Sequence, residues 1–201
     1  MKRGLIVAGA FALVIVLTVV VIVAGGKGKH LGAEPTVELS TPAMVASKSA
    51  ADVEDCPASQ TTDGGLPDVT LPCLGGGRDV DLSTLRGPLL VNIFQANCPP
   101  CRKEMPALEQ FHQQHPDVAV LGIDEVDWMA AAALSQAIER GVTYPMAADP
   151  DGDLLKTQLR VTGYPYTYLL TADGTVTLLK TGGFESAGEI ADALTTAGVA
   201  L

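Results

Sequence analysis

The sequence predicts one three-layer α/β domain preceded by an apolar N-terminal segment. Strand-like and helix-like segments alternate in the order βαβαββα, and two of the strand-like runs, residues 89–94 and 118–123, are apolar almost throughout, as in strands buried on both faces. At 201 residues, 47% of them hydrophobic, the chain has room for one ordinary domain with a core. The net charge of -10 argues against nucleic acid or anionic lipid as a partner, because phosphate recognition needs clustered lysine and arginine.

The N-terminal segment has two basic residues followed by an unbroken apolar run over residues 4–24. The run has the roughly 20 residues that a helix needs to cross a bilayer, and it is longer than an ordinary secretory h-region. We therefore expect an uncleaved, single-pass membrane anchor at residues 1–24, with a cleaved signal sequence as the alternative. Residues 25–55 are rich in Ala, Ser, Thr, Pro and Gly, which predicts a flexible linker, and residues 56–201 would form the folded domain.

The first half of the domain predicts a hairpin, a central strand and a helix. Two short strand-like pieces flank the three consecutive glycines at residues 75–77, which favour a turn. The apolar run at residues 89–94 predicts a central strand. Residues 100–115 carry apolar side chains at helical spacing and end before Pro116, so a helix follows that strand directly.

The second half of the domain alternates helices and strands again. The expected elements are a strand at residues 118–123, helices at residues 127–140 and 152–159, and strands at residues 166–170 and 175–180. The last two strands form a hairpin because Ala172-Asp173-Gly174 is turn chemistry. Ser186 begins a final amphipathic helix, in which Glu189 completes a capping box.

Cys98 and Cys101 are separated by two residues, at the junction of the central strand and the helix that follows it. A helix N-terminus presents amide donors and the positive end of the helix dipole, and both lower the pKa of a thiol. Because the thiolate is the attacking species in disulfide exchange, Cys98 is the expected nucleophile and Cys101 the resolving thiol. The alternatives are a structural disulfide or half of a zinc site. The three histidines are not spaced as a second half-site, so we expect neither a metal nor a cofactor.

The other two cysteines, Cys56 and Cys73, lie in the leading part of the domain. We expect them to form a structural disulfide, which persists outside the cytoplasm and agrees with the N-terminal anchor. The alternative is a second redox pair that relays electrons with Cys98 and Cys101.

The active-site segment resembles that of a known family. Residues 90–106, which include Asn97-Cys98-Pro99-Pro100-Cys101, look like the active-site segment of the TlpA/ResA-type, membrane-anchored thioredoxin-like proteins. Residues 161–165 look like the cis-proline loop of that family. The resemblance implies a thioredoxin-like fold, with a central mixed sheet flanked by helices, an N-terminal β-hairpin extension and one preceding transmembrane helix.

The resemblance also implies which residues meet the substrate. In thioredoxins the cis-proline faces the disulfide and helps to hold the substrate chain. Pro165 and the preceding Tyr164 are therefore candidate substrate contacts, together with the residues around Cys98, namely Asn97, Pro99 and Pro100. Asn97 stands where the family usually has Trp, which removes a flat apolar surface beside the reactive sulfur.

Two polar residues near the cysteine pair are further candidates. Glu104, six residues after Cys98, matches a glutamate that ResA-like members place near the active site. A carboxylate there would raise the thiol pKa by like-charge repulsion and could relay protons. The alternative is an exposed glutamate on the helix surface. Asn92 stands where cytoplasmic thioredoxins carry a buried aspartate, so this chain lacks that acid.

The expected activity is extracytoplasmic thiol-disulfide exchange that reduces the disulfides of exported proteins. Pro99 and Pro100 have no amide hydrogen to donate toward Cys98, which favours a less stabilised thiolate and a low reduction potential. The resemblance implies re-reduction by a membrane thiol relay and suggests apocytochrome c, in cytochrome c maturation at the cell envelope, as one possible client. The alternatives are a disulfide-forming oxidase of secreted proteins, a thiol peroxidase, and a non-catalytic binding or chaperone module of the same fold.

Overall fold

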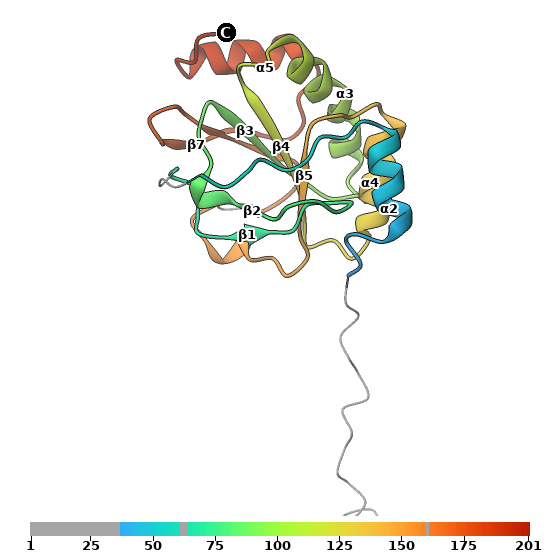
Figure 1. Cartoon of the computed structure of the whole chain (residues 1–201). Coiled ribbons are helices and arrows are strands. Elements are labelled where there is room, and N and C mark those ends of the chain that lie inside the picture. Colours follow the sequence, from blue (N-terminus) through green and yellow to red (C-terminus); the bar gives the residue numbers. More distant parts are fainter. Residues whose placement is uncertain (1–36, 61–63, 160) are drawn as a thin grey trace, which may run out of the picture. The chain divides into compact units, whose positions relative to one another are not determined.

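The structure is a computed structural model, and it describes residues 37–60, 64–159 and 161–201 (Figure 1). The membrane anchor expected at residues 1–24 and the first part of the expected linker lie outside these ranges. No helix in the described part of the chain is long and apolar enough to span a membrane. The compact unit that contains every described residue begins at Val37.

A five-stranded mixed sheet forms the centre of the domain, with strands in the order β5-β4-β3-β6-β7. The strands are β3 (Leu89–Phe94), β4 (Ala119–Glu125), β5 (Met146–Asp149), β6 (Tyr166–Leu170) and β7 (Val176–Thr181). Central β3 runs parallel to β4 and antiparallel to β6. The predicted central strand and late hairpin are confirmed. Strand β5 was not predicted, because its Met-Ala-Ala-Asp sequence has little strand propensity and depends on pairing with β4 and on a bridge from Ala147 to Cys73.

The two faces of the sheet are covered differently. Three α-helices pack on the face that carries Leu90 and Phe94. They are α3 (Pro99–Gln114), α4 (Ala130–Glu139) and α5 (Ala187–Thr196). The opposite face, which carries Val91 and Ile93, is covered by the predicted hairpin of β1 (Thr70–Leu71) and β2 (Val80–Asp81) and by the turns η1 (Leu82–Thr84) and η2 (Leu154–Lys156). The helix expected at residues 152–159 is thus a single 3-10 turn.

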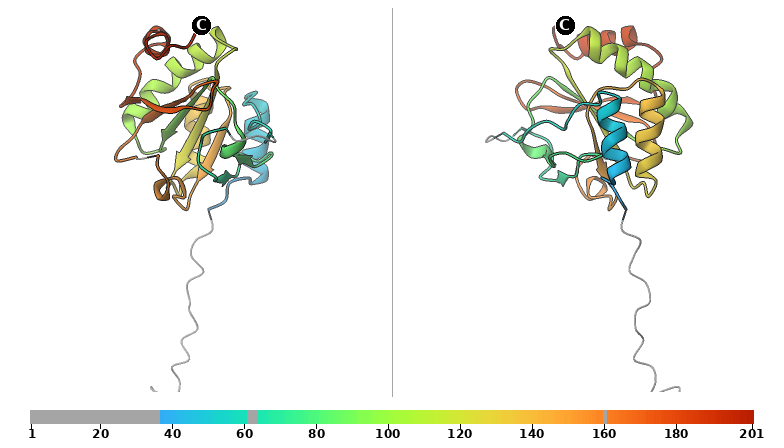
Figure 2. Two further views of the ribbon diagram at one scale, coloured as in Figure 1. Left: turned by 90° about the vertical axis from the view of Figure 1, so that its left-hand side faces the viewer. Right: turned by 45° about the vertical axis from the view of Figure 1, so that its right-hand side comes forward.

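The expectation of a flexible linker up to residue 55 is wrong for its described part. Helix α2 (Pro42–Ala50) forms there and lies beside α4 (Figure 2). Its N-cap is Thr41, and Met44 is buried in the core. The sequence did not indicate this helix because its Ala- and Ser-rich stretch has little periodicity, so that contacts with the rest of the domain stabilise it.

The glycines at residues 75–77 form the surface against which α2 packs. All three have positive φ angles, and a Cβ atom at Gly75 would lie 3.2 Å from the Lys48 side chain. A Cβ atom at Gly76 would lie 3.0 Å from Val45. The glycines therefore provide both the turn conformation that the sequence predicted and the close approach of a helix that it did not.

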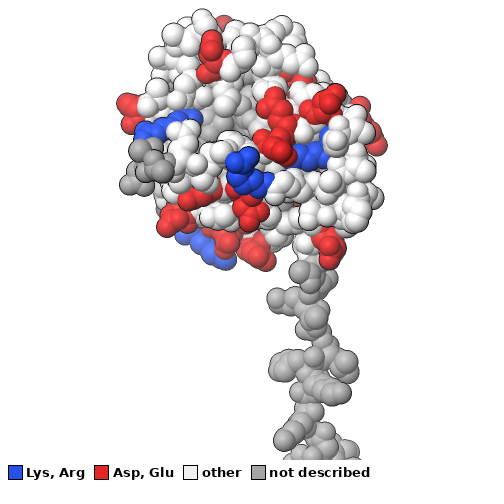
Figure 3. All heavy atoms as spheres, in the orientation of Figure 1, with Lys and Arg blue, Asp and Glu red and all other residues white. Residues whose placement is uncertain are grey.

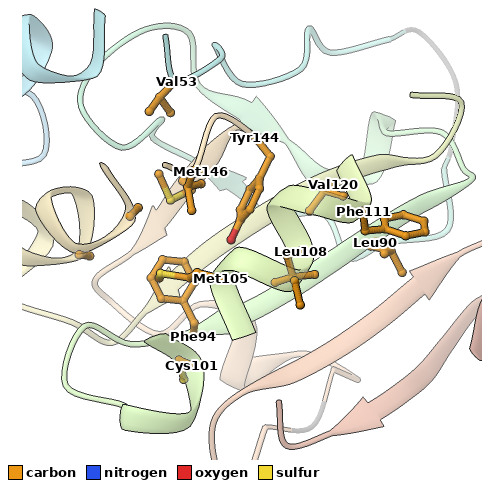
Figure 4. Packing of buried hydrophobic residues seen from close by; sticks show 14 of the residues in the cluster. Val53, Leu90, Phe94, Cys101, Met105, Leu108, Phe111, Val120, Tyr144 and Met146 are labelled. Carbon is orange, nitrogen blue, oxygen red and sulfur yellow. The ribbon is translucent and has the colours of Figure 1, made fainter. Parts of the chain in front are cut away.

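The core beneath the helices reaches the cysteine pair. Figure 4 shows Cys101 in the same cluster as Phe94 and Met105, and Cys101 is 0% exposed. On the surface, acidic side chains spread over the face seen in Figure 3 with basic ones scattered between them. That distribution follows from the net charge of -10.

Candidate active site

The cysteine pair occupies the first turn of α3. Cys98 is the N-cap residue, with extended backbone, and Pro99 and Pro100 begin the helix, where a missing amide hydrogen costs no helical hydrogen bond. The structure pairs Cys98 with Cys101 in a disulfide. Cys98 is half-buried while Cys101 is fully buried, so the first sulfur is the one that a partner can reach. The Cys101 amide donates a hydrogen bond to Cys98 Sγ over 3.2 Å.

Three segments distant in sequence meet at this turn. The peptide bond before Pro165 is cis, as expected from the loop that resembles the family's cis-proline loop. The Pro165 carbonyl accepts a hydrogen bond of 2.8 Å from the Gly182 amide, just after β7. A Cβ atom at Gly183 would lie 3.2 Å from the Pro100 carbonyl oxygen. The end of β7 therefore lies against both the cis-proline loop and the start of α3.

The residues expected to contact substrate differ in accessibility. Asn97, Pro99 and Pro100 are exposed, whereas Tyr164 is half-buried and Pro165 is buried. The Tyr164 hydroxyl donates a hydrogen bond of 2.9 Å to Glu125 Oε2, at the end of β4. Burial raises the pKa of Glu125 to about 7, partly offset by that hydrogen bond.

Glu104 is a buried side chain, not the exposed helix residue of the alternative interpretation. It is 1% exposed, and it accepts hydrogen bonds from Asn92 Nδ2 (2.7 Å) and from the Phe184 amide (3.1 Å). Burial raises the pKa of Glu104 to about 7, while those two hydrogen bonds and Lys180 oppose the rise. Glu104 lies one helical turn after Cys101, so α3 places a buried carboxyl against the side chain of Asn92.

A second loop runs beside the residues that lead into Cys98. Gln95 Nε2 donates to the Glu125 carbonyl oxygen over 2.9 Å, and the Ala96 amide donates to Asp127 Oδ2 over 2.7 Å. No motif in the sequence predicted that this loop would lie beside the cysteine pair. The sequence does carry one signal for it, an acidic run at the carboxyl end of β4. Strand β4 lies next to β3, the strand that precedes the cysteine pair, and ligands of α/β sheets bind at the carboxyl ends of such strands.

Cys56 and Cys73 form the other disulfide, and each is 2% exposed. The buried Lys48 ammonium lies 3.3 Å from Cys73 Sγ and 3.0 Å from Asp55 Oδ1. This disulfide attaches the segment that carries α2 to the hairpin. Its burial favours the structural role that we predicted over a second redox pair.

Within residues 37–60, 64–159 and 161–201, no group of three or more His, Cys, Asp and Glu side chains is placed to hold a metal ion. The reactive groups that the described part of the chain brings together at the start of α3 are two sulfurs and a buried carboxyl. Such a site can exchange two electrons and two protons with another disulfide or dithiol.

Comparisons with known proteins agree with this geometry. Residues 64–179 match the AhpC/TSA family. The chain is 25% identical over 111 residues to sporulation thiol-disulfide oxidoreductase A of Bacillus subtilis (53% of this chain, 66% of that protein). It is 28% identical over 105 residues to thiol-disulfide oxidoreductase ResA of Bacillus thuringiensis (50% of this chain, 58% of that protein). These matches confirm the resemblance to ResA-type proteins, although each spans less than two thirds of the relative's length.

A solved structure shows the same fold. It is that of a secreted Mycobacterium tuberculosis disulfide oxidoreductase homologous to Escherichia coli DsbE, with a TM-score of 0.57 and 24% identity. The match covers 64% of this chain and 96% of that one. The thioredoxin-like fold expected from the sequence is thereby confirmed.

Proposed function

The chain belongs to the AhpC/TSA family, and on that premise we propose that it is a thiol-disulfide oxidoreductase with Cys98 and Cys101 as its reactive pair. The observation that carries the proposal is the difference between the two sulfurs. Cys98 is reachable at the N-cap of α3, whereas Cys101 is fully buried one turn further on. An attacking sulfur must be reachable, and a resolving sulfur only has to reach its neighbour.

The proposed reaction begins from the reduced pair. The Cys98 thiolate attacks one sulfur of a substrate disulfide, which forms a mixed disulfide and releases the other substrate sulfur as a thiolate. Cys101 then loses its proton and attacks Cys98 Sγ, which releases the second substrate thiolate and closes the Cys98–Cys101 disulfide. Two electrons pass to the substrate. Glu104 is the buried group one turn from Cys101 that can take up the proton in the second step.

We propose that the direction of electron flow is reduction of the substrate. The donor to Cys98 Sγ is the Cys101 amide, because Pro99 and Pro100 carry no amide hydrogen. The neighbouring Glu104 carboxyl further disfavours negative charge on the sulfurs. A poorly stabilised dithiol is a stronger reductant.

We further propose that the reaction takes place outside the cytoplasm, on a domain held to the membrane by residues 1–24. The buried Cys56–Cys73 disulfide supports this location, because structural disulfides persist in oxidising compartments. The substrates would be disulfides of exported proteins, with apocytochrome c as one client, and a membrane thiol relay would reduce the enzyme again.

The deciding experiment measures the reduction potential of the Cys98/Cys101 couple in the full-length protein, by equilibration with a thiol redox buffer. A value near or below about -270 mV supports the reductase, whereas a value near about -120 mV makes the protein a disulfide-forming oxidase. Cys98→Ser should abolish disulfide exchange. A Cys98→Ser protein that retained full function in the cell would instead be a binding or chaperone module.

A further inference from the structure

The loop after β4 carries an exposed aromatic side chain beside the reactive cysteine. We infer that Trp128 and its neighbours form the site that binds a large apolar side chain of the substrate, next to the substrate's own disulfide. This inference rests on the proposed function and adds a specificity-determining residue to it. Trp128 would supply, from another loop, the flat apolar surface that Asn97 cannot provide.

The position of Trp128 follows from contacts between two neighbouring loops, residues 95–97 and residues 125–129. Gln95 and Ala96 are held by Glu125 and Asp127. The next residue, Asn97, places its Nδ2 atom 3.5 Å from the sulfur of Met129. Residues 125–129 therefore accompany residues 95–97 up to the position where Cys98 begins α3. A substrate chain bonded to Cys98 therefore has this loop within reach on one side.

Trp128 is the side chain on this loop that the protein leaves most open to solvent. It is 79% exposed, and it is the single tryptophan of the chain. Val126, Met129 and Leu155 are also exposed. The side chains of Val126 and Leu155 lie close to each other, on either side of Gly152. A Cβ atom at Gly152 would lie 2.9 Å from Val126 and 3.3 Å from Leu155. Exposed apolar side chains on and next to a loop that contacts the residues leading into Cys98 indicate a binding surface.

The loop is held rigidly before any substrate arrives. The buried Asp127 side chain, next to Trp128 in the chain, accepts two hydrogen bonds of 2.7 Å, one from the Met129 amide of its own loop and one from the Ala96 amide of the neighbouring loop. Val126 adopts a φ of +49°, which a β-branched residue rarely does. The Val126 amide is fixed by the Asp149 carbonyl oxygen over 2.7 Å. A loop whose backbone is already held in place loses little freedom when a substrate binds to it.

The occupant that fits this surface is an extended substrate segment with an aromatic or large aliphatic side chain beside its cysteine. An indole offers a broad apolar face with little conformational entropy to lose.

The test compares two disulfide-bonded peptides that differ only in the residue beside the cysteine, Leu in one and Ser in the other. Their rates of reduction by the reduced full-length protein give kcat/KM for each, and 2-hydroxyethyl disulfide reports the chemistry alone. We expect the wild-type protein to prefer the Leu peptide by about tenfold, equivalent to about 1.4 kcal/mol. Trp128→Ala should bring the ratio close to one and leave the rate with 2-hydroxyethyl disulfide and the reduction potential unchanged.

The matched control is Leu178→Ala. Leu178 is an exposed apolar residue on β7, an edge strand that is separated from β4 by β3 and β6. It should retain the preference. A Trp128→Ala protein that keeps the preference, or that slows with all three substrates alike, overturns the inference. Failure of the wild-type protein to reduce 2-hydroxyethyl disulfide would instead contradict the proposed function.

Fluorescence gives a readout that needs no turnover, because Trp128 is the only tryptophan. A Cys101→Ser variant retains a mixed disulfide between Cys98 and the peptide. Emission should move to shorter wavelength when the Leu peptide is attached and stay in place with the Ser peptide. An identical spectrum with both peptides would show that Trp128 does not contact the apolar side chain.

Discussion

Asn92 Nδ2 donates a hydrogen bond of 2.7 Å to Glu104 Oε1, and neither side chain is exposed by more than 2%. The bond joins the central strand to the helix that carries the cysteines. Asn92 also donates to Thr167 on β6, over 3.1 Å, so three elements meet at one amide group. Glu104 is held there as a buried acid whose pKa is raised to about 7, mainly by burial.

The raised pKa of Glu104 predicts a stability that falls with pH. In unfolded chains the carboxyl releases its proton near 4.5, whereas folded Glu104 keeps it until about 7. The stability is therefore complete below pH 4.5 and is lost as the pH rises to about 7, by on the order of 3 kcal/mol. Glu104→Gln stays neutral and should escape this loss. Urea denaturation of the oxidised proteins at pH 5 and pH 8 measures the difference.

Other buried acids titrate in both proteins, so the informative quantity is the difference between the free energies of unfolding of wild type and Glu104→Gln. It should shift in favour of the variant between pH 5 and pH 8. A difference that is the same at both pH values would mean that Glu104 is already ionised at pH 5 in the folded protein.

The second prediction concerns Asp127, whose side chain stabilises the fold by accepting hydrogen bonds from two backbone amides. Asp127→Ala leaves the Ala96 and Met129 amides without their acceptor. A buried donor that loses its partner costs about 1–3 kcal/mol, so we expect a loss in that range in urea denaturation at pH 7. Asp127→Asn keeps one acceptor oxygen and should lose less. Equal losses in the two variants would indicate that the negative charge, rather than the hydrogen bonds, is what matters.

The Cys56–Cys73 disulfide is expected to affect stability and not the redox chemistry. It closes a loop of 17 residues, for which chain entropy predicts a stabilisation of about 3 kcal/mol. The Cys56→Ser/Cys73→Ser double variant should unfold at correspondingly lower urea concentration. Its Cys98/Cys101 reduction potential should equal that of the wild-type protein. A shifted potential would support the alternative in which the two pairs exchange electrons.

The parts of the structure that could be predicted are those determined by nearby residues. Strand β3 follows from one apolar run, and the N-terminus of α3 follows from the Cys98 N-cap and the prolines after it. Helix α2 and strand β5 could not be predicted in this way. Both are rich in alanine, and each depends on partners far along the chain, α4 for the helix and β4 for the strand.

The residues of the candidate active site differ in the same way in how well the sequence predicts them. The cysteine pair, Glu104 and Pro165 lie in short motifs that can be recognised in the sequence alone. Trp128 lies in no such motif. Its place beside Cys98 depends on the register that pairs Phe94 with Asp124, because that pairing brings the residues after β3 alongside the residues after β4. Neither segment on its own indicates which residue the other will meet.

Gly182 and Gly183 offer a matched pair that tests how closely β7 must approach the site. Gly183 leaves little room for a side chain, since a Cβ atom would lie 3.2 Å from the Pro100 carbonyl oxygen and 3.3 Å from Glu104 Cβ, so that these neighbours would have to move by a few tenths of an ångström. Gly183→Ala should therefore push the strand end away and admit water to the Glu104 carboxyl. The pKa of Glu104 should then fall toward its ordinary value, and the loss of stability between pH 5 and pH 8 should shrink.

Gly182→Ala separates this effect from simple backbone strain. Gly182 has a φ of +82° and no atom near its missing Cβ, so alanine there is strained but contacts nothing. We expect it to lower the free energy of unfolding by about 1–2 kcal/mol, equally at pH 5 and pH 8. If Gly183→Ala behaves in the same way, with its pH dependence intact, the close approach of the chain after β7 has no part in keeping Glu104 buried, and the burial that raises the Glu104 pKa must come from its other neighbours.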